Sequence, residues 1–336
     1  MAASVQPLPG RGFLAFAERL HLLQEELSLR FKINADARHC RLHGDILFLP
    51  DCADGDIAPY WAQCVLQEPF LLHFDSIGEA ASALKAIQRN WAPYQFKLFR
   101  RAALLQEKLP YINLKERQFF KDGHCGIDIP HTAMGLYTLL DEHTILASAR
   151  TSSCLPAGIV RLAQDHVNPP SRAYLKLQEA LVLARHFFRA ELPAKNTRCF
   201  DAGASPGGWT WVLSALGAAV LAVDRTELAP QLMTNPRVTF RRHDAFTLRP
   251  QELGAFDWIF SDVACYPQRL LEWVRLWLQS GLVKNMICTI KMQGAADYSL
   301  VQQFADIPCS RVLHLSANKH ELTWIHCGTE SSILNA

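Results

Sequence analysis

The stretch Phe200-Asp-Ala-Gly-Ala-Ser-Pro-Gly-Gly-Trp-Thr210 decides the fold of the second half of the chain. An apolar strand runs into Gly203, a turn with Gly207 and Gly208 follows, and a helix comes next. Glycines let a ligand approach the backbone closely, and the start of a helix offers unpaired N–H groups. The spacing is G-x-x-x-G-G, and Ser205 stands where a dinucleotide site would require its second glycine. The turn therefore predicts a ligand other than a pyrophosphate.

Strand and helix signals alternate around this turn. Strands separated by helical crossovers favour a mostly parallel, doubly wound sheet. The last two strands, 311–315 and 321–327, are joined by a short link, which favours an antiparallel hairpin at the sheet edge. The predicted fold class is therefore α/β and Rossmann-like. The other predicted elements are helices over 175–189 (with Ser171 or a neighbour as cap), 211–216, 268–280 and 299–304, and strands over 199–200, 219–224, 238–243, 258–262 and 286–291.

Two acidic residues follow the strands after the glycine turn. Asp224 ends the second strand, where a carboxylate can accept hydrogen bonds from ribose hydroxyls. Asp244 follows the third strand, where a carboxylate can accept from an adenine amine. Turn and acids together predict a site for S-adenosyl-L-methionine, which also offers a carboxylate and an amine. The predicted cofactor-binding residues are Asp201, Gly203, Ala204, Ser205, Pro206, Gly207, Gly208, Trp209, Asp224, Asp244 and Asp262.

The first half of the chain mixes helix and strand signals differently, and favours a smaller α+β domain with an antiparallel sheet. The Pro-Pro pair in Asp165-His-Val-Asn-Pro-Pro-Ser171 interrupts the pattern. We therefore expect two domains, over residues 1–165 and 166–336. The predicted elements of the first are helices over 13–27 and 77–90, a further helix starting within 58–62, and strands over 40–49, 70–74, 95–99 and 144–148.

Composition places the chain among ordinary globular proteins. It has 336 residues, a formal net charge of +2 and 20% charged residues, and no stretch approaches the ~20 apolar residues of a membrane span. Its ten cysteines form no CxxC pair. Scattered cysteines and an N-terminus without a signal-peptide pattern predict a cytoplasmic protein with reduced thiols. His39 and His43 have a metal-ligand spacing only on a helix, and this stretch is predicted as a strand, so no metal site is expected.

Four charged residues occur in an order that resembles the FtsJ-like 2′-O-ribose RNA methyltransferases. Lys176 lies in Ser-Arg-Ala-Tyr-Leu-Lys-Leu-Gln-Glu, on the helix before the first strand. Asp262 follows the fourth strand in Ser-Asp-Val, and Lys291 ends the fifth in Thr-Ile-Lys-Met. Glu321 stands on a later strand in Lys-His-Glu-Leu-Thr-Trp. The resemblance covers about residues 168–328 and implies a methyltransferase domain in which these four residues are catalytic.

The implied reaction explains the residue types. A ribose 2′-hydroxyl has a high pKa, so a base must take its proton as it attacks the sulfonium methyl. A lysine can do this only if its own pKa is depressed, and a second ammonium nearby would depress it. We therefore expect Lys291 to be the base and Lys176 to keep the pKa of Lys291 low. Asp262 and Glu321 would orient the two lysines.

The segment Pro-Ser-Arg-x-x-Leu-Lys-Leu-x-Glu-Ala, followed by A-x-P-G-G-W-T, is similar to the large-subunit ribosomal RNA methyltransferase M group. A THUMP-like RNA-binding domain precedes the catalytic domain in that group. This implies RNA binding by residues 1–165 and 23S ribosomal RNA as substrate. Near-neutral charge requires local basic clusters for RNA binding. The candidates are Arg89, Lys97, Arg100, Arg101, Lys115 and Arg117, and separately Arg237, Arg241 and Arg242.

Alternatives remain open. The chain could be a catalytically idle RNA-binding protein that keeps the fold, or a methyltransferase for a different RNA or for a base. Asn168-Pro-Pro-Ser171 resembles the N-P-P-aromatic motif of amino-group methyltransferases, but Ser171 replaces the stacking ring, which favours a linker. Cys265 has neither a preceding proline nor an evident base, which disfavours a cysteine nucleophile. The tryptophans Trp258, Trp273 and Trp277 are predicted to be core residues.

Overall fold

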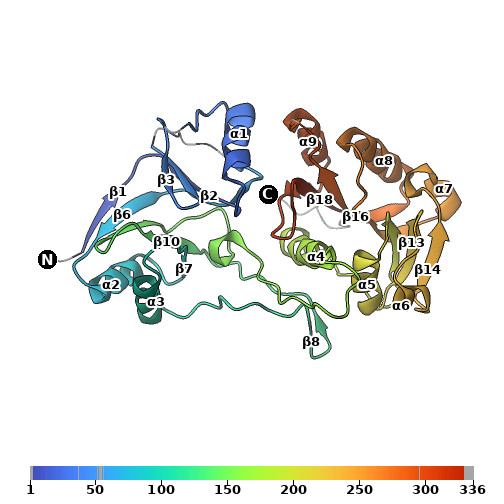
Figure 1. The fold of residues 1–336 in the computed structure, drawn as a ribbon, viewed down its shortest axis with the longest axis horizontal. Helices are drawn as coiled ribbons and strands as arrows, with labels where there is room; N and C mark the ends of the chain where they lie inside the picture. Colours follow the sequence, from blue (N-terminus) through green and yellow to red (C-terminus); the bar gives the residue numbers. More distant parts are fainter. Residues whose placement is uncertain are drawn as a thin grey trace. The chain divides into compact units, whose positions relative to one another are not determined.

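The structure, a computed structural model, describes residues 3–36, 38–50, 52, 55, 57–294 and 296–328 (Figure 1). The chain folds into two compact units. Unit 1 comprises the described residues up to Glu116 together with Ile129–Arg161. Unit 2 comprises Arg117–Asp128 and the described residues from Leu162 onward. Among the described residues, no helix is long and apolar enough to cross a membrane.

Unit 2 is built on a seven-stranded sheet of order β14-β13-β12-β15-β16-β18-β17. The strands from β14 to β16 are parallel, whereas β18 runs antiparallel to both β16 and β17. This confirms the predicted α/β fold and its antiparallel edge. The strands are β12 (Arg198–Ala202), β13 (Ala219–Asp224), β14 (Val238–Arg242), β15 (Phe256–Ser261), β16 (Val283–Lys291), β17 (Ser310–Leu313) and β18 (Glu321–Cys327).

The helices of unit 2 follow the predicted pattern closely. Prolines stand in the first turn of α6, α7 and α8, where their missing N–H costs nothing. Gly281 ends α8 in a left-handed conformation that suits glycine. The three predicted core tryptophans Trp258, Trp273 and Trp277 are all buried. The helices are α4 (Tyr174–Phe188), α5 (Gly208–Ala215), α6 (Pro230–Met233), α7 (Pro250–Leu253), α8 (Pro267–Ser280) and α9 (Tyr298–Ala305), and a small hairpin joins β8 (Phe120–Lys121) to β9 (His124–Cys125).

Unit 1 contains two sheets, of order β1-β6-β11-β10-β7 and β3-β4-β2-β5. All pairings are antiparallel except that of β7 with β10, in line with the predicted α+β domain. Helix α2 begins with a capping box formed by Ser76 and Glu79. The strands are β1 (Ser4–Pro7), β2 (Arg11–Ala15), β3 (Arg41–His43), β4 (Ile46–Leu49), β5 (Ala62–Leu66), β6 (Pro69–His73), β7 (Trp91–Pro93), β10 (Gly135–Leu139) and β11 (Thr144–Ser148), and the helices are α1 (Leu20–Phe31), α2 (Ile77–Ile87) and α3 (Phe99–Lys108).

Three predictions for the first half are wrong, and the strand expected over 40–49 is divided into the antiparallel strands β3 and β4 by a turn at Gly44 and Asp45. The helix expected over 13–27 begins only at Leu20, because Phe13 to Ala15 form the buried central strand β2. The helix expected from within 58–62 is replaced by strand β5. The strand expected over 95–99 is instead an irregular segment that leads into α3. Short buried apolar runs do not show whether they are helix or strand, which explains the first two errors.

Candidate active site

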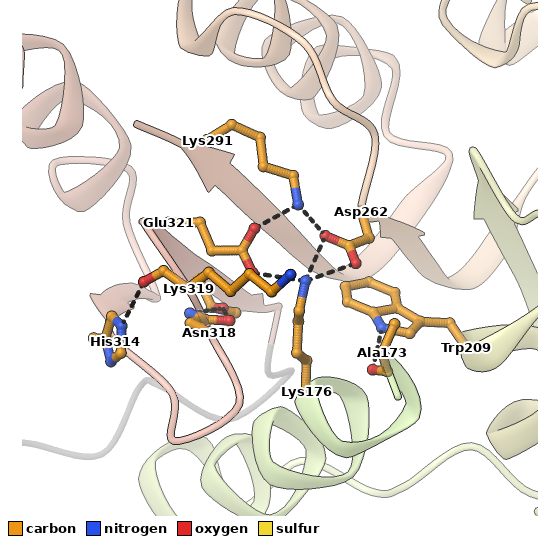
Figure 2. Close-up of polar contacts among 10 residues, drawn as sticks. Ala173, Lys176, Trp209, Asp262, Lys291, His314, Asn318, Lys319 and Glu321 are labelled. Carbon is orange, nitrogen blue, oxygen red and sulfur yellow. Dashed lines mark hydrogen bonds and ion pairs between the residues drawn. The ribbon is translucent and has the colours of Figure 1, made fainter. Parts of the chain in front are cut away.

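Four charged side chains from four elements of unit 2 converge at the carboxyl end of the parallel strands (Figure 2). Lys291 is the last residue of β16, and Asp262 directly follows β15. Glu321 opens β18 and is paired with Lys291 in the antiparallel ladder. Lys176 lies in the first turn of α4. The structure thus brings together the four residues that the sequence singled out as catalytic.

Each lysine contacts both carboxylates. Lys176 Nζ lies 2.9 Å from Asp262 Oδ2 and 2.6 Å from Glu321 Oε1. Lys291 Nζ lies 2.5 Å from Asp262 Oδ1 and 2.6 Å from Glu321 Oε2. The four groups therefore form a closed ring in which positive and negative charges alternate. We call this arrangement the Lys–Asp–Lys–Glu ring.

The ring is shielded from water, since its side chains are between 8% and 18% exposed. Charges interact more strongly in such surroundings than at an open surface. Burial alone would lower the pKa of Lys291, but Asp262 and Glu321 outweigh it and raise that pKa above its usual range. Burial likewise raises the pKa of Glu321, but hydrogen bonds from Lys176 and Lys291 outweigh it and lower that pKa. The prediction of a depressed lysine pKa is therefore wrong for this arrangement, because two carboxylates outweigh one neighbouring ammonium.

The predicted cofactor turn joins β12 to α5 and requires glycine at three positions. Gly203 and Gly207 have φ of +79° and +111°, a region that residues with a Cβ rarely adopt. A Cβ on Gly203 would lie 2.1 Å from Val263 Cγ2, and one on Gly208 would lie 2.4 Å from Ser171 Oγ. The missing side chains of these two glycines let the backbone pack closely against Val263 and Ser171. These residues fit the close approach of a ligand such as S-adenosylmethionine.

Ser171 packs under this turn and does not cap α4, whose N-cap is Ala173 without a side-chain bond. The indole of Trp209 donates to the Ala173 carbonyl oxygen at 2.9 Å and so ties the cofactor turn to the helix that carries Lys176 (Figure 2). The Ala204, Ser205 and Pro206 positions complete the turn between Gly203 and Gly207.

Two of the predicted acidic residues accept hydrogen bonds from the turn or from residues beside it. Asp224, at the end of β13, accepts hydrogen bonds from the amides of Ser205 at 3.0 Å and Thr226 at 2.9 Å. Asp201, in β12, is buried and accepts a hydrogen bond from the Thr210 hydroxyl at 2.6 Å. Burial raises the pKa of Asp201 to about 7, although the Thr210 contact lowers it. Thr210 was not singled out from the sequence as a partner of this carboxylate.

The third predicted carboxylate, Asp244, already holds cationic partners. Its Oδ2 accepts from Arg225 at 2.6 Å and from Arg269 at 3.3 Å, and its Oδ1 accepts the amide of Phe246 at 3.0 Å. Burial opposes ionisation, but the Phe246 amide and the two guanidinium groups keep the pKa of Asp244 below its usual value. The prediction that Asp244 accepts from an adenine amine remains a prediction. An amine at this position would have to share Oδ2 with Arg225.

Sequence analysis missed Glu179, three residues after Lys176 in α4. Glu179 is 5% exposed and accepts from the backbone amide and the hydroxyl of Ser316, in the loop before β18. Asn318 in the same loop donates to Thr323 Oγ1 at 3.0 Å. The i, i+3 spacing from Lys176 was the available signal, because it places both side chains on one side of the helix.

Comparison with known proteins agrees with this architecture. Residues 169–307 match the FtsJ-like methyltransferase family. This confirms the family resemblance that the charged residues and the glycine turn indicated. Among solved structures, 1,6-didemethyltoxoflavin-N1-methyltransferase from Burkholderia thailandensis superposes with a TM-score of 0.33 at 17% identity, covering 48% of this chain and 80% of that one.

The chain is also similar to curated relatives named ribosomal RNA large subunit methyltransferase M. It is 38% identical to the protein from Halorhodospira halophila over 151 residues, which is 45% of this chain. The proteins from Xylella fastidiosa and Azoarcus sp. are 35% identical over 157 residues and 33% identical over 165 residues, or 46% and 48% of this chain. The match spans 43% to 44% of the length of these relatives.

Proposed function

We propose that this chain transfers the methyl group of S-adenosylmethionine to a ribose 2′-hydroxyl of RNA, with 23S ribosomal RNA as the substrate. The observation that carries the proposal is the closed Lys–Asp–Lys–Glu ring at the carboxyl end of the sheet. The match of residues 169–307 to the FtsJ-like methyltransferases supports methyl transfer, and the names of the relatives support ribosomal RNA.

The glycine turn would hold the amino acid end of the cofactor, Asp224 its ribose and Asp244 its adenine amine. When bound, the cofactor supplies an electrophilic methyl group on a sulfonium, which is a good leaving group. Most of the rate enhancement would then come from holding the RNA hydroxyl in line with the methyl–sulfur bond. The four ring residues surround one point in unit 2 and are suited to hold that hydroxyl.

Lys291 Nζ would accept the proton of the 2′-hydroxyl. Because Asp262 and Glu321 raise the pKa of Lys291, its ammonium must first release a proton to solvent before the amine can act as a base. A hydroxyl that enters the ring beside Lys291 and donates to its neutral amine would displace that amine from one of its two carboxylate partners. That displacement would lower the pKa of Lys291, while Lys176 would keep a carboxylate partner. The substrate thereby helps to prepare its own base.

The test is methyl transfer by the purified full chain with S-adenosylmethionine and ribosomal RNA lacking the modification. The product is digested to nucleosides and analysed by mass spectrometry. A 2′-O-methylnucleoside that depends on the protein and the cofactor is the expected result. Methyl groups found only on bases would contradict the ribose assignment, and no transfer with bound RNA would favour the idle RNA-binding alternative.

A further inference from the structure

Apart from the Lys–Asp–Lys–Glu ring, unit 2 contains a pocket on the side of α4 that faces away from the ring. It encloses about 630 Å³, and Phe120, Tyr174, Gln178 and Trp211 contribute to its wall together with residues 163–168. Tyr174 and Gln178 are four residues apart in α4 and so share one face of the helix. Lys176 lies between them in sequence, roughly 200° around the helix axis from each. The pocket is therefore separate from the candidate active site.

The rings of Phe119, Phe120, Tyr174 and Trp211 line this pocket, and the last three lie against one another. Phe120, from the β8–β9 hairpin, has its ring centroid 5.9 Å from that of Trp211 with an interplanar angle of 88°. Tyr174 lies 5.7 Å from Trp211 at 78°. Both rings stand nearly perpendicular to the indole, so the wall has aromatic surfaces in more than one orientation. Such a wall favours a planar ring as ligand, because aromatic pairs gain from stacked and edge-on contacts.

Gln178 contributes a hydrogen-bond acceptor without a donor to the wall of the pocket. This residue is only 3% exposed, and its side-chain carbonyl Oε1 is buried without a hydrogen-bond partner among the described residues. A buried acceptor without a donor is destabilising, so such groups are normally paired in a folded protein. A turn of the Gln178 amide toward the pocket would let this acceptor bind an N–H group at the edge of a planar ligand.

The charged residues around the pocket limit the kinds of ligand it can bind. Its described lining includes Asp165 but neither lysine nor arginine, so the interior does not suit a phosphate. The Asp165 carboxylate already accepts hydrogen bonds from the Val167 and Asn168 amides. At the rim, the exposed Arg172 lies with Nη2 3.4 Å from Gln164 Oε1. A neutral ring can therefore enter while an attached phosphate stays outside, near Arg172.

We propose that this pocket binds one unstacked nucleobase of the RNA, at a nucleotide other than the one that is methylated. Bases splayed out of single-stranded RNA are commonly read by aromatic stacking together with hydrogen bonds to the base edge. The proposal rests on RNA being the substrate. The same helix carries Lys176 on one face and this pocket on another, so a base bound here would fix the RNA relative to the ring.

Photo-crosslinking of the full chain to a single-stranded RNA that contains 4-thiouridine tests the proposal. We expect adducts on the peptides that contain Phe120, Tyr174 or Trp211, located by mass spectrometry. The Lys291→Ala variant should give the same adducts, because the pocket lies away from the ring. Adducts confined to other peptides would overturn the proposal. An inactive protein that still forms the expected adducts would instead refute the proposed methyl transfer and leave the pocket assignment standing.

Substitutions provide the second measurement. Gln178→Leu keeps the side-chain volume and removes the acceptor, and should weaken RNA binding on the order of 3- to 10-fold, the loss for one hydrogen bond. Phe120→Leu should weaken it on the order of 5- to 100-fold, the range for one lost stacking contact. Gln303→Leu, on the exposed face of α9, is the matched control and should leave affinity unchanged. RNA affinity unaffected by both pocket variants, in proteins that unfold cooperatively like the wild type, would overturn the proposal.

Discussion

Glu179 accepts two hydrogen bonds from Ser316, one from its backbone amide at 2.9 Å and one from its hydroxyl at 3.0 Å. Glu179 lies in the helix that carries Lys176, and Ser316 lies five residues before Glu321. The pair therefore ties together two elements that each supply a residue to the ring. Burial raises the pKa of Glu179 to about 7, even though the contacts with Ser316 lower it.

This raised pKa predicts a pH-dependent stability. A free glutamate loses its proton near pH 4.3, so between about pH 4.3 and 7 the folded protein binds more protons than the unfolded chain. The contribution of Glu179 to the free energy of unfolding is thus present at low pH and is lost as pH rises through this window, by at most about 1.4 kcal/mol per pH unit. Glu179→Gln should remove that loss and gain stability over the wild type from pH 5 to pH 8.

Thermal unfolding midpoints at several pH values test this expectation. Glu252→Gln, an exposed substitution in α7, is the control and should follow the wild type. If the unfolding midpoint of Glu179→Gln depended on pH in the same way as that of the wild type, Glu179 would be ionised in both the folded and the unfolded protein.

The base assignment predicts that Lys291→Ala loses the chemical step. We expect single-turnover methyl transfer to fall on the order of 10²- to 10⁴-fold, the range for a lost general base. Lys291→Arg should not restore it, because a guanidinium with a pKa above about 12 cannot take the proton near neutral pH. Lys284→Ala, in the same strand but exposed and paired with Asp257 at 3.5 Å, is the control. Near-normal transfer by Lys291→Ala would rule out its role as base.

Glu321 predicts a shift in the pH dependence of the reaction. Its carboxylate is one of the two that raise the pKa of Lys291. Glu321→Gln should therefore lower that pKa, because one of the two adjacent opposite charges is lost. Because the base acts in its neutral form, the rising limb of the kcat/KM profile should move to lower pH. An unshifted limb, with activity still measurable, would indicate that Lys291 is not the group that titrates.

Asp224 predicts a specific loss of cofactor affinity. Asp224→Ala should weaken binding of S-adenosylmethionine by roughly 1–3 kcal/mol, the scale for losing hydrogen bonds to a charged acceptor. Part of the loss would come from the turn itself, since Asp224 also accepts the amide of Ser205. Asp257→Ala is a matched control, because Asp257 also accepts a strand amide, that of Arg198, but stands at the start of β15. Calorimetry showing equal affinity for both variants would contradict the assignment.

The basic residues of α3 and the segment before it predict a salt-dependent contribution to RNA binding. Lys97 and Arg100 are exposed, and Phe99 beside them is 60% exposed. If residues 1–165 bind RNA, the double substitution Lys97→Ala/Arg100→Ala should lower affinity and reduce the slope of log K against log salt by about 1–2. Lys85→Ala/Arg19→Ala is the control within the same unit. An unchanged slope in the first variant would place the RNA contacts elsewhere.

The sequence predicted the fold of unit 2 far better than that of unit 1. Alternating strands and helices separated by glycine and proline turns define a parallel sheet almost unambiguously, and β13, β18 and α8 lie within a residue of their predicted bounds. In unit 1, Phe13 and its neighbours form a fully buried strand between two others. Such a run has no polar face, so neither a period of two nor one of 3.6 can identify it.

In the candidate site, some features could be predicted from the sequence and others could not. Lys176, Asp262, Lys291 and Glu321 could be chosen in advance, because their order along the chain resembles that of the FtsJ-like methyltransferases. Whether the pKa of Lys291 is raised or lowered could not be predicted from the sequence. That shift depends on whether Nζ lies nearer to an ammonium or to a carboxylate. Glu179 was equally hidden, because its partner Ser316 is 137 residues away in the chain.

The antiparallel pairing of β16 with β18 also limits how the chain can change length. Side chains alternate between the two faces of a strand, so deleting or inserting a single residue within either strand would turn Lys291 or Glu321 to the opposite face. The loop that begins with Gln293 and Gly294 follows the last ladder pair, so an insertion after Gln293 would leave the register of Lys291 and Glu321 unchanged. In a library of single-residue insertions and deletions, we therefore expect activity to survive in that loop and to be lost within the two strands.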